Sequence, residues 1–323
     1  MSEQAWRSNQ PTNVSAPSAE DVSQSPSGAR LTPGSAEAAL SVVIVAYRHP
    51  ELLEECLHSV AAHNDLGTRL EVIVVDNSPA PGLVPWLRTE FPWVHSVPNP
   101  NLGFGQANNV GCQLSHGEYL CFLNPDTELI EPTFGYVLAR LRQSASMAAC
   151  GVRLLKPDRS QAISFFWTDS GGILRSVTQH ALQALGLFIP GLMCTSGAAL
   201  FVRTAAFIEC GGFDERIFMY NEEPDLSRRL RARGYRWGYL PGRSIVHHEG
   251  GTADGALDSM SRRVDSLHIY CSKYGLSYEG RLRAELRYLT LKWIALRLLG
   301  RDHRSAQLQR ALIRRNLNPQ PGR

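Results

Sequence analysis

The chain has 323 residues, 43% of them hydrophobic and 20% charged. This is enough for one large or two ordinary domains and too apolar for a disordered protein, and no apolar run is long enough to span a bilayer. The formal net charge of +3 is uneven, because residues 281–323 carry eleven Lys and Arg against two acidic residues, a net of +9, which leaves −6 for the remainder. A mildly acidic body with a basic end argues against nucleic-acid binding and indicates an anionic partner for that end.

The first 37 residues contain eight Ser and four Pro but few large apolar side chains. Such a segment buries too little surface to offset the entropy lost on ordering, so we expect a disordered leader over 1–37. No basic and apolar secretion signal precedes the first strand, which favours a cytoplasmic protein. The seven cysteines are scattered without a C-x-x-C pair, so we expect buried thiols rather than a disulfide framework or a zinc site.

Two continuous β-branched runs, 40–46 and 70–76, are typical of strands buried on both faces of a parallel sheet. A helix is expected between them, since Pro50 opens a stretch whose apolar residues recur on one helical face. The alternation continues with a strand near 94–97, a helix over 105–115 and a strand over 119–123. The first half therefore predicts an open, mostly parallel, Rossmann-like α/β sheet with helices on both faces.

The second half is less regular and ends in three long helical stretches. Strands are expected at 148–154 and 198–202, followed by a strand pair at 235–240 and 244–247. Helices are expected at 204–210, 225–233, 257–274, 279–299 and 303–316.

Polar residues follow three of the predicted parallel strands, at the edge where such sheets bind ligands. The strands end at Ala46-Tyr47, Asp76-Asn77 and Asn124-Pro125-Asp126. Each end alone is explained by a turn in which Asp or Asn bonds to local backbone. Three such ends favour a nucleotide site, in which Asp76 accepts hydrogen bonds from a base or ribose.

A glycine-containing segment precedes the helix that carries Asn108 and Asn109. Gly103 can let the backbone approach an anion and expose N–H donors, although a tight loop-to-helix turn needs the same glycine. The segment does not follow the first strand and no G-x-x-x-x-G-K-[ST] loop is present. Dinucleotide oxidoreductases and P-loop enzymes are therefore disfavoured.

Two further patterns suggest metal binding and proton transfer. Asp126 follows a buried strand and suits Mg²⁺ or Mn²⁺ shared with substrate phosphates, and His247, which ends a later strand, is a candidate second ligand. Glu222, Glu223 and Asp225 crowd together ahead of a helix. They either complement the helix dipole or include a carboxylate whose pKa is raised enough to act as a general base.

Eight motifs occur in an order that resembles glycosyltransferase family 2, the inverting transferases of GT-A fold. They are SVVIVAYR, EVIVVDN, NLGFGQANN, CFLNPDTE, TSGAALFVR, CGGFDE, YNEEPDL and SIVHHEGG. The resemblance is greatest to the rhamnosyltransferase branch and covers about residues 40–275. It implies a GT-A domain over 38–275. The charge and the periodicity of the remaining residues predict a basic amphipathic helical tail over 276–323.

The resemblance implies metal-dependent transfer, with inversion, from a nucleotide-diphosphate sugar, with dTDP-rhamnose favoured. The acceptor would be a hydroxyl of a glycan or lipid-linked glycan in cell-surface polysaccharide biosynthesis. Metal ligands then fall on Asp126 and His247, and catalytic residues on Glu223 and Asp225, with Glu223 at a base position that the family usually fills with aspartate. Donor-binding residues fall on Ala46, Tyr47, Asp76, Asn77, Gly103, Asn108, Asn109 and Asn124.

Two alternatives to this enzyme make different demands on the sequence. A catalytically inactive subunit that binds sugar nucleotides is favoured only by glutamate in place of aspartate at position 223. A nucleotidyltransferase would need a glycine-rich basic loop after the first strand, and this sequence lacks one.

The basic end has an amphipathic pattern over residues 280–304. Its apolar residues recur at steps of three and four, at Leu282, Leu286, Leu289, Trp293 and Leu296, among several arginines. The residues Leu291, Ile294 and Leu298 widen this stripe. This pattern predicts a helix that lies on an anionic membrane surface, at the inner face of the cell membrane. The alternative is a helix packed on the catalytic domain, because periodicity is the same in both cases.

Overall fold

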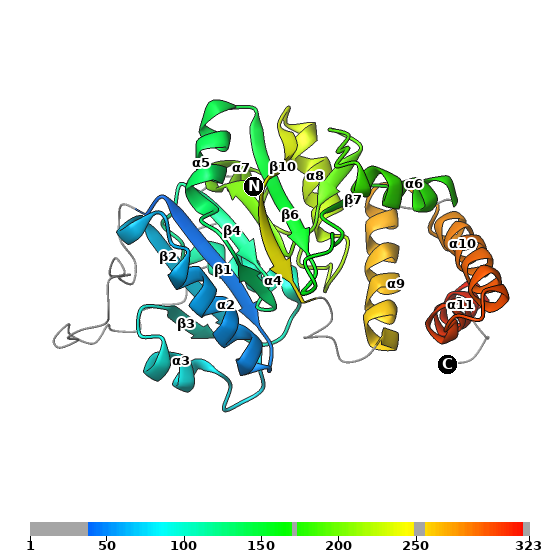
Figure 1. Ribbon diagram of the computed structural model, residues 1–323, viewed down its shortest axis with the longest axis horizontal. Coiled ribbons are helices and arrows are strands. Elements are labelled where there is room, and N and C mark those ends of the chain that lie inside the picture. The colour runs from blue at the N-terminus through cyan, green and yellow to red at the C-terminus, as the bar shows by residue number, and fades with distance from the viewer. Residues whose placement is uncertain (1–37, 170–172, 249–255, 319–323) are drawn as a thin grey trace.

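The computed structural model describes residues 38–169, 173–248 and 256–318, so the predicted leader lies outside the described residues. Its main element is an eight-stranded sheet with the order β3-β2-β1-β4-β9-β6-β10-β5 (Figure 1). These strands are β1 Leu40–Ala46, β2 Leu70–Asp76, β3 His95–Pro98, β4 Tyr119–Leu123, β5 Thr127–Leu129, β6 Met147–Leu155, β9 Ala199–Arg203 and β10 Arg236–His247. A separate two-stranded sheet joins β7 Phe165–Trp167 to β8 Met193–Thr195.

The helices are spread along the chain between and after these strands. They are α2 Pro50–Ala62, α3 Val84–Glu90, α4 Phe104–Gln113, α5 Phe134–Gln143, α6 Ile173–Ala184, α7 Thr204–Glu209, α8 Glu222–Ala232, α9 Ala256–Lys273, α10 Tyr278–Leu298 and α11 Arg304–Leu317. A short 3₁₀ turn, Gly67–Arg69, precedes β2.

The predicted mostly parallel α/β sheet is confirmed. β1 pairs in parallel with β2 and β4, β2 with β3, and β6 with β10. β9 runs antiparallel between β4 and β6, and β5 runs antiparallel to β10. Every residue of β1 and β2 is buried, as the continuous β-branched runs predict.

The predicted strand pair at 235–240 and 244–247 is wrong. Both segments belong to β10, whose two halves pair in parallel with β6 on either side of an irregularity between Leu240 and Ser244. Pro241-Gly242 has the composition of a turn, but here it interrupts the hydrogen-bond ladder without reversing the chain.

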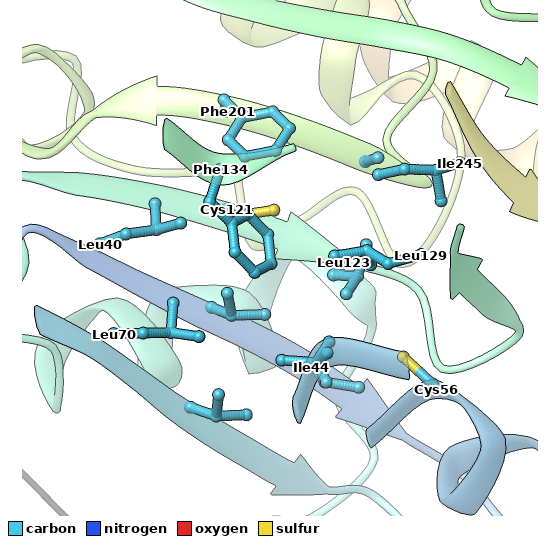
Figure 2. Close-up of a cluster of buried hydrophobic side chains, with 14 of the residues drawn as sticks. Leu40, Ile44, Cys56, Leu70, Cys121, Leu123, Leu129, Phe134, Phe201 and Ile245 are labelled. Carbon is cyan, nitrogen blue, oxygen red and sulfur yellow. The ribbon is translucent and has the colours of Figure 1, made fainter. Parts of the chain in front are cut away.

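Hydrophobic side chains cover both faces of the sheet. On one face, Leu40, Ile44 and Leu70 of the strands pack with Cys56 of α2 and Phe134 of α5 (Figure 2). On the other face, alternate strand residues such as Val43 and Phe122 pack with α7 and α8. Because side chains alternate along a strand, the two faces belong to separate clusters. The predicted helices on both faces are confirmed.

All seven cysteines are free and buried, in agreement with the prediction of buried thiols. Cys56 and Cys121 lie in the cluster of Figure 2. Burial raises the pKa of the Cys56 thiol to about 12. These side chains act as small packing groups.

The three C-terminal helices form a cluster of their own, in which α10 and α11 lie beyond α9 and away from the main sheet (Figure 1). Leu282 and Leu289 of the predicted membrane-facing stripe are buried there, against α9 and α11. The prediction that Leu282 and Leu289 meet lipid is therefore wrong, because other helices already cover them, whereas Leu291, Ile294 and Leu298 of the same predicted stripe are exposed. Among the described residues, no helix combines the length and apolarity needed to cross a bilayer.

Candidate active site

A cavity of about 620 Å³ opens where β1, β2, β4 and β10 end. The structure brings six of the predicted site residues together in its walls: Tyr47, Asn77, Asn124, Asp126, Glu223 and His247. Glu222, Phe218 and two arginines of α9 also line it. The convergence of strand ends that the sequence predicts therefore produces a real cavity.

Asp126 and His247 lie together in this cavity. Nε2 of His247 is 3.3 Å from Oδ1 of Asp126, and this buried oxygen accepts no hydrogen bond from any described residue. Nδ2 of Asn124 lies 3.5 Å from the same histidine nitrogen. A buried carboxylate oxygen without a donor, beside an imidazole, suits a divalent cation that also binds substrate phosphates. The described residues contain no group of three or more His, Cys, Asp or Glu side chains placed to hold a metal.

Two adjacent glutamates at the start of α8 contribute their carboxyl groups to the cavity wall. Oε1 of Glu223 accepts the N–H of Gly197 at 2.8 Å, and a Cβ at Gly197 would meet the same oxygen at that distance. Oε2 of Glu222 is buried without a hydrogen-bond partner among the described residues. Burial raises the pKa of both carboxyls, and the neighbouring charge of Glu223 raises that of Glu222 further.

The loop before α8 has an unusual backbone. Tyr220 and Asn221 have φ angles of 68° and 70°, a left-handed conformation that costs energy in non-glycine residues. Two residues before Tyr220, the carbonyl of Phe218 accepts the N–H of Phe104 at 2.7 Å. Gly103 permits this approach, since a Cβ there would lie 2.7 Å from the carbonyl oxygen of Phe218. Gly103 therefore shapes the cavity wall without being part of its lining.

Asp225, predicted as catalytic, does not line the cavity. Its side chain is fully buried, and Oδ1 lies 2.6 Å from the Lys273 ammonium and 2.7 Å from the Tyr274 hydroxyl. Oδ2 accepts a hydrogen bond from Nε of Arg229 at 2.8 Å. Asp225 thus fastens α8, which carries Glu223, to the end of α9.

Two predicted donor-binding residues of the first strands are also directed away from the cavity. Asp76 accepts the N–H of Ser78 at 2.9 Å and that of Leu83, so its carboxylate closes the loop that follows β2. This is the local turn that the sequence left open as an alternative. Ala46 is fully buried in the core cluster.

Asn108 and Asn109 are buried on α4 and have structural partners. Nδ2 of Asn108 donates to the carbonyl of Phe104 at 3.0 Å. The Asn109 amide both donates to and accepts from the backbone of Phe213, at 2.9 and 2.8 Å. Neither residue is among those that line the cavity.

Sequence reasoning missed the aromatic and basic parts of the cavity wall. Phe166 and Trp167 of β7 line it, and the FFW run at 165–167 was a usable signal for an aromatic surface. Arg262 of α9 also lines it. Nothing in its helical sequence context distinguishes it from a solvated arginine.

Comparison with known proteins identifies the family to which this chain belongs. Residues 41–207, more than half of the chain, match the model of glycosyl transferase family 2. The chain belongs to this family. It is therefore an enzyme that transfers sugar, and the family predicted from the ordered motifs is confirmed.

Several curated relatives of this glycosyltransferase have names that refer to rhamnose. It is 28% identical over 290 residues to N-acetylglucosaminyl-diphospho-decaprenol L-rhamnosyltransferase of Mycobacterium tuberculosis, an alignment that covers 80% of this chain and 91% of that protein. It is 23% identical over 271 residues to rhamnosyltransferase WbbL of Escherichia coli, with 78% and 93% covered.

Solved structures support the GT-A-like fold of the glycosyltransferase. Mannosyltransferase PcManGT of Pyrobaculum calidifontis, in complex with GDP-Man and Mn²⁺, is 15% identical with a TM-score of 0.55, and the match covers 98% of this chain and 92% of that one. TarS of S. aureus is 17% identical with a TM-score of 0.50, over 77% of this chain and 42% of that one.

Proposed function

We propose that this glycosyltransferase moves rhamnose from dTDP-rhamnose to a hydroxyl of a glycan or lipid-linked glycan, with inversion, in cell-surface polysaccharide biosynthesis. The observation that carries the proposal is that Glu223 and the Asp126–His247 pair line one cavity with Tyr47 and Asn77. The proposed base, metal ligands and nucleotide-binding wall would thus be within reach of one substrate. The rhamnosyltransferase names of two relatives support the choice of sugar, and the diphospho-decaprenol of one name supports a lipid-linked acceptor.

In the proposed reaction, Glu223 accepts the proton of the acceptor hydroxyl while that oxygen attacks the anomeric carbon from the face opposite the diphosphate. The new C–O bond forms as the bond from that carbon to the diphosphate oxygen breaks, and the nucleoside diphosphate leaves. The N–H of Gly197 holds the Glu223 carboxyl in place. Mg²⁺ or Mn²⁺ bound by Asp126 and His247 would neutralise charge on the leaving diphosphate.

The test uses the full chain with dTDP-rhamnose and a polyprenyl-diphospho-N-acetylglucosamine acceptor, and detects the disaccharide product by mass spectrometry. We expect product with Mn²⁺ or Mg²⁺ and none with EDTA. UDP-glucose and GDP-mannose serve as alternative donors. Turnover with one of these alone would show that the sugar is wrong, and nucleotide binding without any turnover would show a binding subunit.

We also propose that the exposed part of the predicted stripe on α10 contacts an anionic membrane, which would place the enzyme at the inner face of the cell membrane. Leu291, Ile294 and Leu298 are 52%, 42% and 82% exposed, and their spacing puts them on one side of the helix. Arg287 and Lys292, both exposed, add positive charge along the same stretch. An exposed apolar row with basic neighbours is typical of helices that bind anionic lipid without crossing it.

Vesicle flotation tests this surface. We expect the protein to float with phosphatidylglycerol vesicles at low salt and to stay behind with pure phosphatidylcholine. The double substitution Leu291→Glu with Leu298→Glu should abolish flotation, whereas Leu308→Glu, at a similarly exposed leucine of α11, should not. Undiminished flotation of the double variant would show that another surface binds.

A further inference from the structure

The cavity has a basic wall that comes from outside the segment matched by the family model. Arg262 and Arg263 of α9 line it, whereas the match ends at residue 207. α9 runs beside the main sheet, between the sheet and the other C-terminal helices (Figure 1). Arg263 is largely exposed and forms an ion pair with Glu285 at 2.9 Å. Arg262 is the better placed of the two to meet a ligand.

Arg262 differs from the basic residues around it, which have acidic partners. Arg228 pairs with Asp169, Arg229 with Asp225 and Lys273 with Asp214, at 2.5–2.7 Å. No carboxylate within the described ranges pairs with Arg262. Its guanidinium carbon lies 5.1 Å from the centre of the Phe218 ring. This stacking restrains the guanidinium while leaving its N–H edge available.

The loop beneath Arg262 is itself fixed to the site. One turn further along α9, Ser266 donates from its hydroxyl to the carbonyl of Met219 at 2.7 Å. Arg262 and Ser266 are four residues apart and therefore share a face of α9. The same loop accepts the N–H of Phe104 through the carbonyl of Phe218. The loop that carries Phe218, on which the Arg262 guanidinium rests, is thus hydrogen-bonded to both α4 and α9.

We propose that Arg262 binds a diphosphate group in this cavity, an inference that rests on the proposed function. The cavity is lined by three carboxylic acids, Asp126, Glu222 and Glu223, so an anionic ligand needs positive charge there. A guanidinium offers two parallel N–H groups that match a pair of phosphate oxygens. A diphosphate is present in the nucleotide donor and also in a lipid-diphosphate acceptor, and both contain the chemistry that Arg262 would recognise.

The first arm of the test measures the donor side without acceptor. Isothermal titration calorimetry measures the dissociation constants of dTDP, UDP and GDP, each with Mn²⁺, for the wild type, Arg262→Ala and Arg262→Lys. We expect the tightest nucleotide to bind about 10- to 100-fold more weakly to Arg262→Ala, with Arg262→Lys in between, because lysine keeps the charge and loses the fork. Arg283→Ala, which removes an exposed arginine of α10, should bind as the wild type does.

The second arm measures the acceptor side with geranyl diphosphate, a short lipid diphosphate, as an inhibitor of dTDP-rhamnose turnover. Weaker inhibition of Arg262→Lys with unchanged nucleotide affinity would support the proposal and assign Arg262 to the acceptor. If both Arg262 variants kept the wild-type nucleotide affinity and the wild-type inhibition, the diphosphate proposal would be overturned. The proposed function would still stand in that case, provided that the wild-type protein transfers rhamnose. A wild-type protein that binds no diphosphate would overturn both.

Discussion

Replacement of Glu223 by glutamine should remove the proposed base while keeping its position. The amide oxygen of glutamine can still accept the N–H of Gly197, now held at 2.8 Å, so the start of α8 should keep its geometry. An amide cannot take up the acceptor proton at neutral pH. Loss of a general base typically slows turnover by about 10²- to 10⁴-fold, which corresponds to about 3–5 kcal/mol of barrier. Affinity for dTDP should change by less than about threefold, because the base acts in the transition state.

The neighbouring glutamate provides a matched control. Glu222→Gln changes the same functional group, one residue away and equally buried, at a carboxyl whose pKa burial has raised. Burial and the charge of Glu223 favour the neutral form of the Glu222 carboxyl, which a glutamine amide resembles, so we expect kcat to remain within a few-fold of wild type. Both variants are assayed for kcat with dTDP-rhamnose and for dTDP affinity. Near-normal turnover by Glu223→Gln together with a dead Glu222→Gln would refute the assignment of the base.

Four further outcomes are expected from the same contacts. Asp126→Ala should abolish metal-dependent turnover with little change in Tm, since Oδ1 accepts no hydrogen bond within the described residues, and wild-type turnover would contradict the metal site. Lys273→Met should lower the free energy of unfolding in urea by about 1.5–3 kcal/mol, because buried Asp225 loses one charged partner and keeps Arg229. An unchanged urea midpoint would contradict the role of Lys273 in stabilising buried Asp225. Because the base must be ionised, kcat/KM should rise with pH through the raised pKa of Glu223. A value of kcat/KM that stays constant on the acid side of the pH profile would exclude Glu223 as the base. Conversely, the stability contributed by these two carboxyls should be fully present below the ordinary glutamate pKa of 4.5 and be lost as pH rises through their raised pKa values, because the unfolded chain releases these protons first. The difference in urea midpoint between wild type and Glu222→Gln, followed across pH, would show this loss.

The strands were predictable where burial on both faces leaves a simple pattern. The predicted segments 40–46 and 70–76 coincide with β1 and β2, because a strand between two helical layers needs apolar, β-branched residues at every position. The sequence predicts two strands in place of β10, because Pro241-Gly242 is compatible with both a turn and a bulge. Only the pairing with β6 decides between the two. The helix predicted over 279–299 matches α10, but its apolar stripe could not reveal whether helices or lipid would cover it.

The candidate site was predictable only in part, because a residue's place along the chain does not determine its partners. Asp126 directly precedes β5, whose Thr127 pairs with His247 at the end of β10, so the pairing of β5 with β10 brings the two side chains together. Asn109, by contrast, is occupied by the backbone of Phe213, which is 104 residues away. Arg262 enters the cavity because α9 returns to the sheet, and no local pattern encodes that return.

The burial of all seven cysteines has a practical consequence for spectroscopy. The thiolate is the form that reacts with maleimides and iodoacetamides, and a thiol such as Cys56, with its pKa at about 12, supplies very little of it. A cysteine introduced at an exposed position such as Leu298, which is 82% exposed, would react far faster than the native ones. A fluorophore could therefore be attached there in an otherwise unaltered chain, and its emission would report directly on how close α10 comes to a lipid surface.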